Sequence, residues 1–382
     1  MSARIPLSEP TFGTEEEELL LQAVRSGYVS SVGPLVGAFE EEFAAAVGSR
    51  YAVACSSGTA ALHLALLAVG VQPGDDVLVS DLTFIASANP ARYCRAEVGL
   101  VDAETDTWNL NCAEVVAELH RRARRGVDQP GAIVAVHVLG QPADLAELID
   151  VCHQLGVSLI EDAAEALGAS WTSGPLAGRQ VGTVGRVGCF SFNGNKVITS
   201  GGGGMVVTDE PELARDVRHL ATQARLPGVA YRHDQVGYNY RLTNIAAAVG
   251  LAQLRRLPEL LSARRLVADR YDELLGSEAG VQLPPDLPWA ARSSWLYSVL
   301  LADPATREAV RLALDAAGVE ARPIWPALRT QDPYRDSIVL GGQTALDIAA
   351  RGLSLPSSAQ LRPADQQRTV DVVRSTLARL RG

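Results

Sequence analysis

Lysine is nearly absent from this chain: of its 34 lysine and arginine residues, only Lys196 is lysine. Arginine stays protonated in proteins and cannot form a Schiff base, whereas a desolvated lysine can become a free amine. A surface lysine in a compositionally biased chain is the ordinary alternative. However, Lys196 ends the segment Phe-Ser-Phe-Asn-Gly-Asn-Lys and precedes Gly201–Gly204, whose backbone can pass close to a bulky group. We therefore predict that Lys196 performs chemistry.

An excess of positive charge is also missing. The net charge is −10, whereas a protein that binds nucleic-acid phosphates needs a basic surface. Arg121–Arg125 contains the only basic run, and it closes a predicted helix, where cations suit the helix dipole. The composition therefore argues against a nucleic-acid partner, and we interpret the run as a solvated helix end.

Paired cysteines, clustered histidines and long apolar runs are lacking as well. The five cysteines are odd in number and show no Cys-x-x-Cys spacing, which favours reduced thiols and a cytoplasmic location. The six histidines show no ligand spacing, so we expect no metal site. His63 and Gln72 flank the longest apolar run, which is too short to cross a membrane. The opening residues do not resemble a signal peptide.

Alternation of strand-like and helix-like patterns occupies the first 210 residues. It predicts an α/β fold with a mostly parallel sheet flanked by helices, in which ligands bind at the carboxyl ends of the strands. A capping box of Thr14 and Glu17 should open the first helix. The predicted strands are Tyr51–Cys55, Asp76–Ser80, Glu97–Val101, Ala132–Val138 and Val157–Glu161, and the predicted helices between them are Thr59–Gly70, Phe84–Tyr93, one capped by Asn111, and Asp144–Leu155.

The pattern changes after about residue 240, where longer helices and proline-rich stretches predominate. We predict a large ligand-binding domain over residues 1–250 and a smaller α+β domain over 251–382, with residues 1–13 packing against the smaller domain. The elements predicted there are helices Thr243–Arg256, Leu257–Leu275 and Ala364–Leu380, and strands Trp295–Leu301 and Val319–Arg322.

Two predicted strand ends carry residues suited to a phosphate and a cationic ring. Ser57, Gly58 and Thr59 form a small-residue turn before a helix, where backbone N–H groups attract a phosphate. An ordinary strand-to-helix turn explains the same residues. Asp162 follows an apolar strand and could pair with a protonated pyridine nitrogen. Its alternative is a helix N-cap.

Two further residues complete the set. Phe84 follows another strand, where its ring could cover a flat cofactor, although a core phenylalanine is the commoner explanation. Ser191 stands five residues before Lys196, and its hydroxyl could hold a phosphate oxygen. A phosphate cradle, a pyridinium partner, a ring cover and an amine together match pyridoxal 5′-phosphate.

The chain resembles the DegT/DnrJ/EryC1/StrS sugar aminotransferases, which have fold-type I and use pyridoxal phosphate. The resemblance covers nearly the whole chain. It is carried by Ser57-Gly-Thr-Ala-Ala-Leu62, Glu161-Asp-Ala-Ala-Glu-Ala-Leu-Gly168, Phe190-Ser-Phe-Asn-Gly-Asn-Lys196 and Gly237-Tyr-Asn-Tyr-Arg241.

The resemblance implies roles for these positions. Lys196 would join the cofactor covalently and move protons, and Asp162 would pair with the pyridine nitrogen. Phe84 would stack on the ring, while Ser191, Gly58 and Thr59 would hold the phosphate. Asn239 would reach the phosphate of the partner subunit in a homodimer. Glu165 would lie near the ring hydroxyl, where a carboxylate beside a phenolate is repulsive unless it is protonated or paired.

The same resemblance implies transfer of an amino group from L-glutamate to a nucleotide-linked keto-sugar, most like the enzymes that aminate C4 of 4-keto-6-deoxy sugars. Asn193 and Trp325 are candidate sugar contacts, although packing explains Trp325 equally well. Ala327 and Leu328 stand where relatives often have a histidine. Alternatives are a 3-keto-sugar or cyclitol aminotransferase, a sugar dehydratase, whose relatives replace the lysine by histidine, and a non-catalytic regulatory relative.

Overall fold

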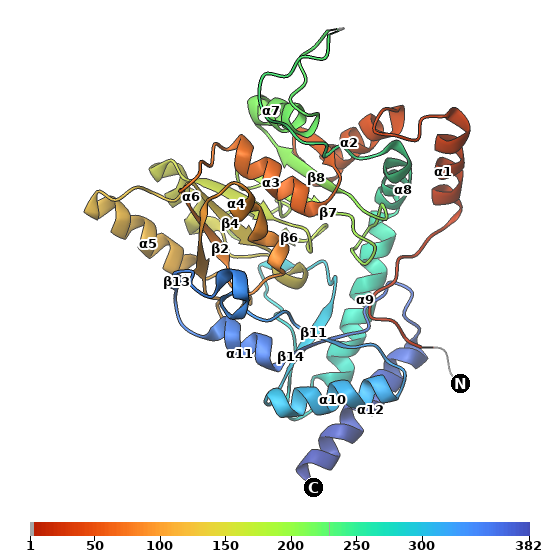
Figure 1. The fold of residues 1–382 in the computed structure, drawn as a ribbon. Coiled ribbons are helices and arrows are strands. Elements are labelled where there is room, and N and C mark those ends of the chain that lie inside the picture. Colours follow the sequence, from red (N-terminus) through yellow and green to blue (C-terminus); the bar gives the residue numbers. More distant parts are fainter. Residues whose placement is uncertain (1–3, 229) are drawn as a thin grey trace.

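The computed structural model describes residues 4–228 and 230–382. An eight-stranded sheet forms its centre (Figure 1). β8 runs antiparallel to both of its neighbours, and the remaining neighbouring pairs are parallel. This arrangement confirms the predicted α/β class. In sheet order the strands are β1 (Tyr51–Cys55), β8 (Gly204–Thr208), β7 (Val187–Ser191), β5 (Ser158–Asp162), β4 (Ala132–Val136), β2 (Asp76–Ser80), β3 (Glu97–Val101) and β13 (Val339–Leu340).

Helices cover both faces of the sheet, because successive strand residues point to opposite sides. Val77 and Val79 of β2 pack on one side, whereas Leu78 between them packs on the other. One layer contains α3 (Gly58–Ala68), α4 (Asn89–Tyr93) and α7 (Pro211–Ala221). The opposite layer contains α2 (Pro34–Val47), α5 (Cys112–Arg125), α6 (Ala146–Leu155) and α8 (Asn244–Arg255), with α1 (Thr14–Ser26) against α8.

A second, antiparallel sheet has its own core of buried aliphatic and aromatic side chains. α9 (Leu257–Leu275) follows α8 and extends along this sheet in Figure 1. Ile5, near the amino end, pairs with Val319 of this region. The predicted division of the chain into two domains near residue 250 remains a prediction. The other elements here are β12 (Arg322–Pro323), β14 (Gly352–Leu355), β11 (Tyr297–Leu301), β9 (Val281–Gln282), α10 (Pro304–Ala316), α11 (Thr344–Arg351) and α12 (Pro363–Arg381), while β6 (Ser170–Trp171) pairs with β10 (Ala290–Ala291).

Several predicted boundaries were wrong for local reasons. The first helix is capped at Gly13, whose N–H donates to Glu16 at 2.8 Å, so the predicted pair of Thr14 and Glu17 is displaced by one residue. The segment 84–93 is a 3-10 turn followed by α4 rather than one helix, since Pro90 cannot donate to a continuous helical ladder. The predicted strand at 319–322 shrinks to β12.

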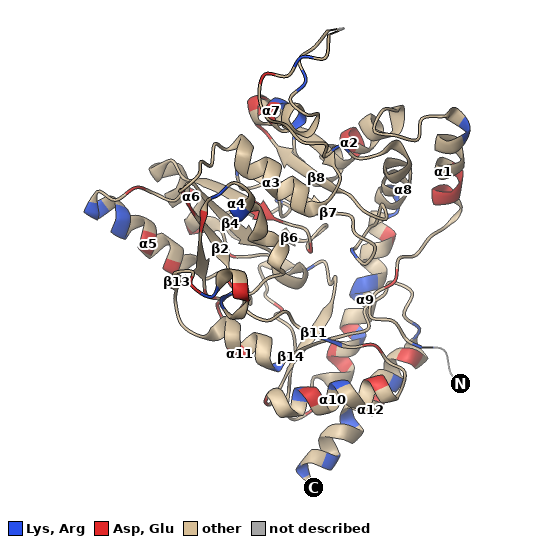
Figure 2. Cartoon of the chain, viewed as in Figure 1, with Lys and Arg blue, Asp and Glu red and all other residues tan. Residues whose placement is uncertain are grey.

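The arginine run does close α5 as predicted, at the far end of that helix in Figure 2. It is not wholly solvated, however. Arg122 is largely covered and pairs with both Glu118 and Asp76 at 2.8 Å, so part of the run holds the helix against the sheet.

Candidate functional site

The carboxyl ends of four parallel strands surround one cavity of about 380 Å³. Because β1, β2, β5 and β7 point the same way, the residues that follow them meet at one edge of the sheet. Asn239 is the one candidate residue that does not line this cavity. The candidates that do line it are Ser57, Gly58, Thr59, Phe84, Asp162, Glu165, Ser191, Asn193, Lys196 and Trp325.

A small-residue cradle forms where α3 starts. Ser57 caps the helix, and its hydroxyl accepts a hydrogen bond from the Ala60 N–H at 3.0 Å. A Cβ on Gly58 would lie only 2.8 Å from Cβ of Ser191, so glycine is needed for β7 to approach the helix start. The exposed N–H groups of this helix end and the Ser191 hydroxyl together suit a phosphate.

Asp162 lies buried on the floor of the cavity at the end of β5. One carboxylate oxygen accepts from the Ala164 N–H at 3.1 Å, and the other accepts from the Ser87 hydroxyl at 2.7 Å. Burial raises the pKa of Asp162, whereas the Ser87 hydrogen bond opposes that rise by favouring the charged form. The carboxylate keeps acceptor capacity for a cationic group in the cavity.

The Lys196 ammonium lies 3.8 Å from the centroid of the Trp295 ring. Such a contact stabilises a cation while replacing water around it. Burial lowers the pKa of Lys196, and the nearby carboxylates of Glu165 and Asp162 oppose that shift. The single lysine of the chain is therefore partly covered by an aromatic ring at the strand ends, with two acidic groups nearby.

Glu165 lies beside this lysine and is itself buried. Burial raises its pKa to about 7, against the opposing charge of Lys196 and the N–H of Leu139, which donates to Oε2 at 2.7 Å. Leu139 adopts a φ of 55°, a backbone conformation that L-residues rarely occupy. The strained turn thus directs one N–H at a carboxyl group that can exist in either protonation state near neutral pH.

Three aromatic rings form one wall of the cavity. Phe84 is 6.0 Å from Trp325 between ring centroids, and Trp325 stacks on Trp295 at 6.1 Å with 19° between planes. Phe84 remains 49 % exposed, so it faces the cavity and is not the core residue that the ordinary interpretation suggested. The apolar wall ends at the lysine.

Asn239 is exposed and lies outside the cavity of its own chain. It bridges to Thr222 at the base of the long excursion that follows α7, which projects from the top of Figure 1. A role for Asn239 therefore requires a second subunit, and it remains a prediction.

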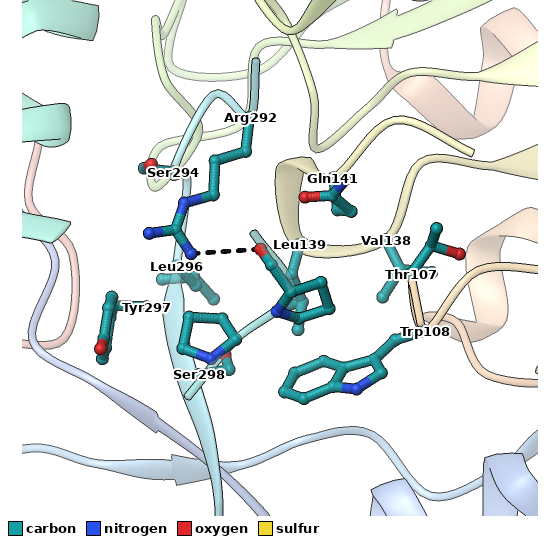
Figure 3. A pocket seen from close by; sticks show the side chains of 12 residues that line it. Thr107, Trp108, Val138, Leu139, Gln141, Arg292, Ser294, Leu296, Tyr297 and Ser298 are labelled. Carbon is teal, nitrogen blue, oxygen red and sulfur yellow. Dashed lines mark hydrogen bonds between the residues drawn. The ribbon is translucent and has the colours of Figure 1, made fainter. Parts of the chain in front are cut away.

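A second, much smaller cavity lies behind the Leu139 turn. Its volume of about 20 Å³ accommodates about one water molecule, so it cannot hold a cofactor. Arg292 donates to the Pro285 carbonyl at the edge of this cavity. Figure 3 shows the side chains that line it, which include Leu139, Gln141, Arg292, Ser294, Leu296 and Ser298. Here the Leu139 turn lies against the segment that carries Trp295.

Sequence reasoning missed Ser87, Trp295 and Arg322 among the residues that line the cavity. Ser87 lies 75 positions from Asp162, and Trp295 lies about a hundred from Lys196. No local pattern reports such contacts. Thr83, whose hydroxyl is 2.8 Å from that of Ser87, could only have been linked to the site once the strand order was known.

Two broader features bear on the type of protein. Among the described residues, no helix is both long and apolar enough to cross a membrane. The same residues contain no cluster of three or more histidine, cysteine, aspartate or glutamate side chains arranged to hold a metal ion.

Comparison with known proteins matches residues 10–374 to the DegT/DnrJ/EryC1/StrS aminotransferase family. A relative from Bacillus subtilis that bears the name of a pyridoxal phosphate-dependent aminotransferase, EpsN, is 39 % identical over 98 % of this chain and 96 % of its own. GDP-perosamine synthase of Caulobacter vibrioides is 38 % identical over 96 % of both chains. The crystal structure of the aminotransferase TlmJ from Streptoalloteichus hindustanus superimposes with a TM-score of 0.90 at 30 % identity, covering 99 % of this chain and all of the other.

Proposed function

The chain belongs to the DegT/DnrJ/EryC1/StrS family of sugar aminotransferases that use pyridoxal phosphate, and from this premise we propose its substrates and the roles of its residues. It takes an amino group from L-glutamate and transfers it to C4 of a nucleotide-linked 4-keto-6-deoxyhexose. The observation that carries the proposal is the meeting of Lys196, Asp162 and the Gly58–Ser191 cradle in one cavity.

Pyridoxal phosphate fits the residues of this cavity. Because Gly58 has no side chain, Ser191 can lie close to the start of α3. The hydroxyl groups of Ser57, Thr59 and Ser191 would then surround a phosphate bound there. Asp162 would hold the pyridine nitrogen in its protonated form, and Phe84 would cover the ring. When bound, the cofactor supplies an aldehyde for the amine and an electron sink.

Proton movement would then depend on the groups around Lys196. Burial lowers the pKa of its ammonium, which favours the free amine that a nucleophile and a general base require. Glu165 would donate from a protonated carboxyl group toward the ring hydroxyl, because its raised pKa resolves the repulsion that a carboxylate would meet there. Trp295 excludes water from the amine.

The sugar would lie against the aromatic wall. Trp325 offers a flat apolar face, and Asn193 offers an amide at the mouth of the cavity. Similarity to GDP-perosamine synthases supports a nucleotide 4-keto-sugar substrate. Ala327 and Leu328 are both buried, so neither supplies the polar contact that a histidine would make there. Asn239 would complete the phosphate site from the partner subunit.

A 3-keto sugar or a cyclitol ketone remains the alternative substrate for the same transamination. Dehydration is less well supported, because Lys196 is present where the dehydratases have histidine. A non-catalytic role would not require the lysine, the aspartate and the serine to meet in one cavity.

The covalent role of Lys196 can be tested directly. Borohydride reduction of the holoenzyme followed by peptide mapping should place a pyridoxyl group on Lys196. The Lys196→Ala variant should remain folded, bind the cofactor without a covalent link and lose turnover by a factor on the order of 10⁴ or more. A K196A protein that retains substantial transamination would contradict the assignment.

The substrate is tested separately. Purified holoenzyme is incubated with L-glutamate and a panel of nucleotide 4-keto and 3-keto sugars and a cyclitol ketone, and the products are identified by mass. The mass change that corresponds to replacement of the carbonyl oxygen by one hydrogen and one amino group should appear for the 4-keto sugars. Reaction of only the 3-keto or cyclitol substrates would move the assignment to the alternative.

A further inference from the structure

Arg264 is a buried arginine that lies near the lysine but outside the cavity. It is on α9 and only 2 % exposed. In the part of the chain that the structure describes, its guanidinium bonds to no carboxylate, and burial lowers the pKa of Arg264 to about 10. Burying an unpaired cation costs several kcal/mol, so its contacts should serve something other than stability alone.

The contacts of Arg264 are three backbone carbonyls and one hydroxyl from separate parts of the chain. Nη1 donates to the carbonyl of Trp295 at 2.9 Å and to that of Ser357 at 2.8 Å. Nη2 lies 3.3 Å from the Ser8 hydroxyl and 3.5 Å from the carbonyl of Lys196. The guanidinium thus links the amino-terminal segment, the lysine loop and the segment before β11.

Two routes from this arginine converge on the peptide next to the lysine. The Trp295 indole N–H donates to the Asn195 carbonyl at 2.6 Å, and the Ser8 hydroxyl donates to the same oxygen at 3.1 Å. Trp295 is therefore held at both ends, by Arg264 at its backbone and by Asn195 at its ring. Its ring position over the amine follows from these bonds.

We propose that Arg264 is a positioning residue for Lys196, which fixes the lysine backbone and the Trp295 ring against each other so that the amine stays covered. The planar fork matters because Nη1 serves the Trp295 and Ser357 carbonyls while Nη2 reaches toward Lys196, and a single ammonium nitrogen cannot occupy both positions. The proposal rests on the proposed role of Lys196 as the reactive amine.

Because Lys196 is the only lysine, the proposed role of Arg264 can be tested without substrate or cofactor. In cofactor-free protein, an amine-reactive reagent can modify only Lys196 and the amino terminus, and peptide mapping separates the two. The pH dependence of labelling reports the ionisation of Lys196. In the Arg264→Met variant, water should reach the ammonium, and the labelling midpoint should rise by about one pH unit.

Matched variants distinguish the effect of the guanidinium geometry of Arg264 from the effect of its positive charge. Arg264→Lys keeps a cation but loses the fork, so its midpoint should also rise, and kcat of both variants should fall by roughly tenfold or more with little change in KM for glutamate. Arg265→Met changes the exposed neighbouring arginine and should match the wild type in both measurements.

Three outcomes would overturn the proposal: a wild-type midpoint in R264M, full rescue by R264K, or an equal shift in R265M. If R264M fails to fold, Trp295→Phe provides the second test. This variant keeps an aromatic ring but removes the indole N–H that donates to the Asn195 carbonyl. The midpoint should rise here as well, so an unchanged midpoint contradicts the proposal. If no 4-keto sugar in the panel reacts but the labelling midpoint of R264M is shifted, the proposed substrate is wrong and the positioning role of Arg264 still holds.

Discussion

Two adjacent carboxylates on β5 are both buried, and their hydrogen-bond partners give them different tasks. Glu161 points away from the cavity and accepts from His137 Nε2 at 3.0 Å and from the N–H groups of Gly182, Val184 and Gly185 at 2.6–2.7 Å. The Ala143 N–H donates to the other nitrogen of His137, so Nε2 carries the proton. Glu161 is saturated and structural, whereas Asp162 keeps acceptor capacity for a ligand.

The hydrogen bond from Ser87 should lower the pKa of Asp162. In Ser87→Ala, the carboxylate loses a donor that favours its charged form, so the pKa of Asp162 should rise further. We expect kcat to fall about tenfold and the acidic limb of the kcat/KM profile to move to higher pH. Ser298→Ala is the control, because it removes a buried hydroxyl that lies 2.8 Å from that of Ser354 and does not line the cavity that contains Asp162. An unshifted profile in S87A would argue against tuning.

Glu165 should make the stability of the cofactor-free protein depend on pH. Its folded pKa of about 7 exceeds the ordinary value of 4.5, so the folded state binds the proton more tightly. Its stabilising contribution is present below about pH 4.5 and is lost as pH rises through 7. Relative to Glu165→Gln, the wild type should lose about 3 kcal/mol between these values. Urea unfolding of both proteins at several pH values measures this, and parallel curves would contradict the raised pKa.

At the scale of elements, the start of α3 depends on the absence of a side chain at Gly58. In Gly58→Ala, the new Cβ would press on Ser191 and displace the cradle. We expect the cofactor dissociation constant to increase by roughly tenfold or more, measured by titration of cofactor-free protein.

Gly37→Ala provides the control within another helix. A Cβ at Gly37 meets nothing within 4 Å, and the position is exposed in the interior of α2. Alanine there should leave cofactor binding unchanged and stabilise the protein by about 0.5–1 kcal/mol. If both substitutions weaken binding equally, the cradle does not explain the effect.

Element boundaries were predictable where local chemistry decides them. Tyr51–Cys55, Asp76–Ser80, Glu97–Val101 and Leu257–Leu275 are confirmed as predicted, and the Asn111 cap of α5 is confirmed by its bond to the Glu114 N–H. Apolar runs ended by turn residues leave little choice of structure. The errors arose at β12, where pairing with β14 decides the outcome, and in the segment before α4, where Pro90 interrupts the helical ladder.

At the scale of the molecule, the position of Asn239 predicts shared active sites. If Asn239 acts across a dimer, mixing unfolded Lys196→Ala and Asn239→Ala chains and refolding them should form hybrids with one intact site each. Random pairing would restore about a quarter of wild-type activity from two weak parents. Each variant refolded alone is the control. Activity no greater than the mean of the parents would contradict a role for Asn239 across a dimer.

The sequence alone determined the α/β class, the family, the cofactor and the single candidate amine. Those properties can be recognised from short contiguous motifs and from the chemistry of single residues, without knowing which distant residues meet in the fold. Only the tertiary structure decided that Ser87 supports Asp162, that Trp295 covers Lys196 and that Arg264 reaches three separate carbonyls. These contacts join residues far apart in the chain, and they exist only because the strand order and the packing of helices and loops bring the segments together.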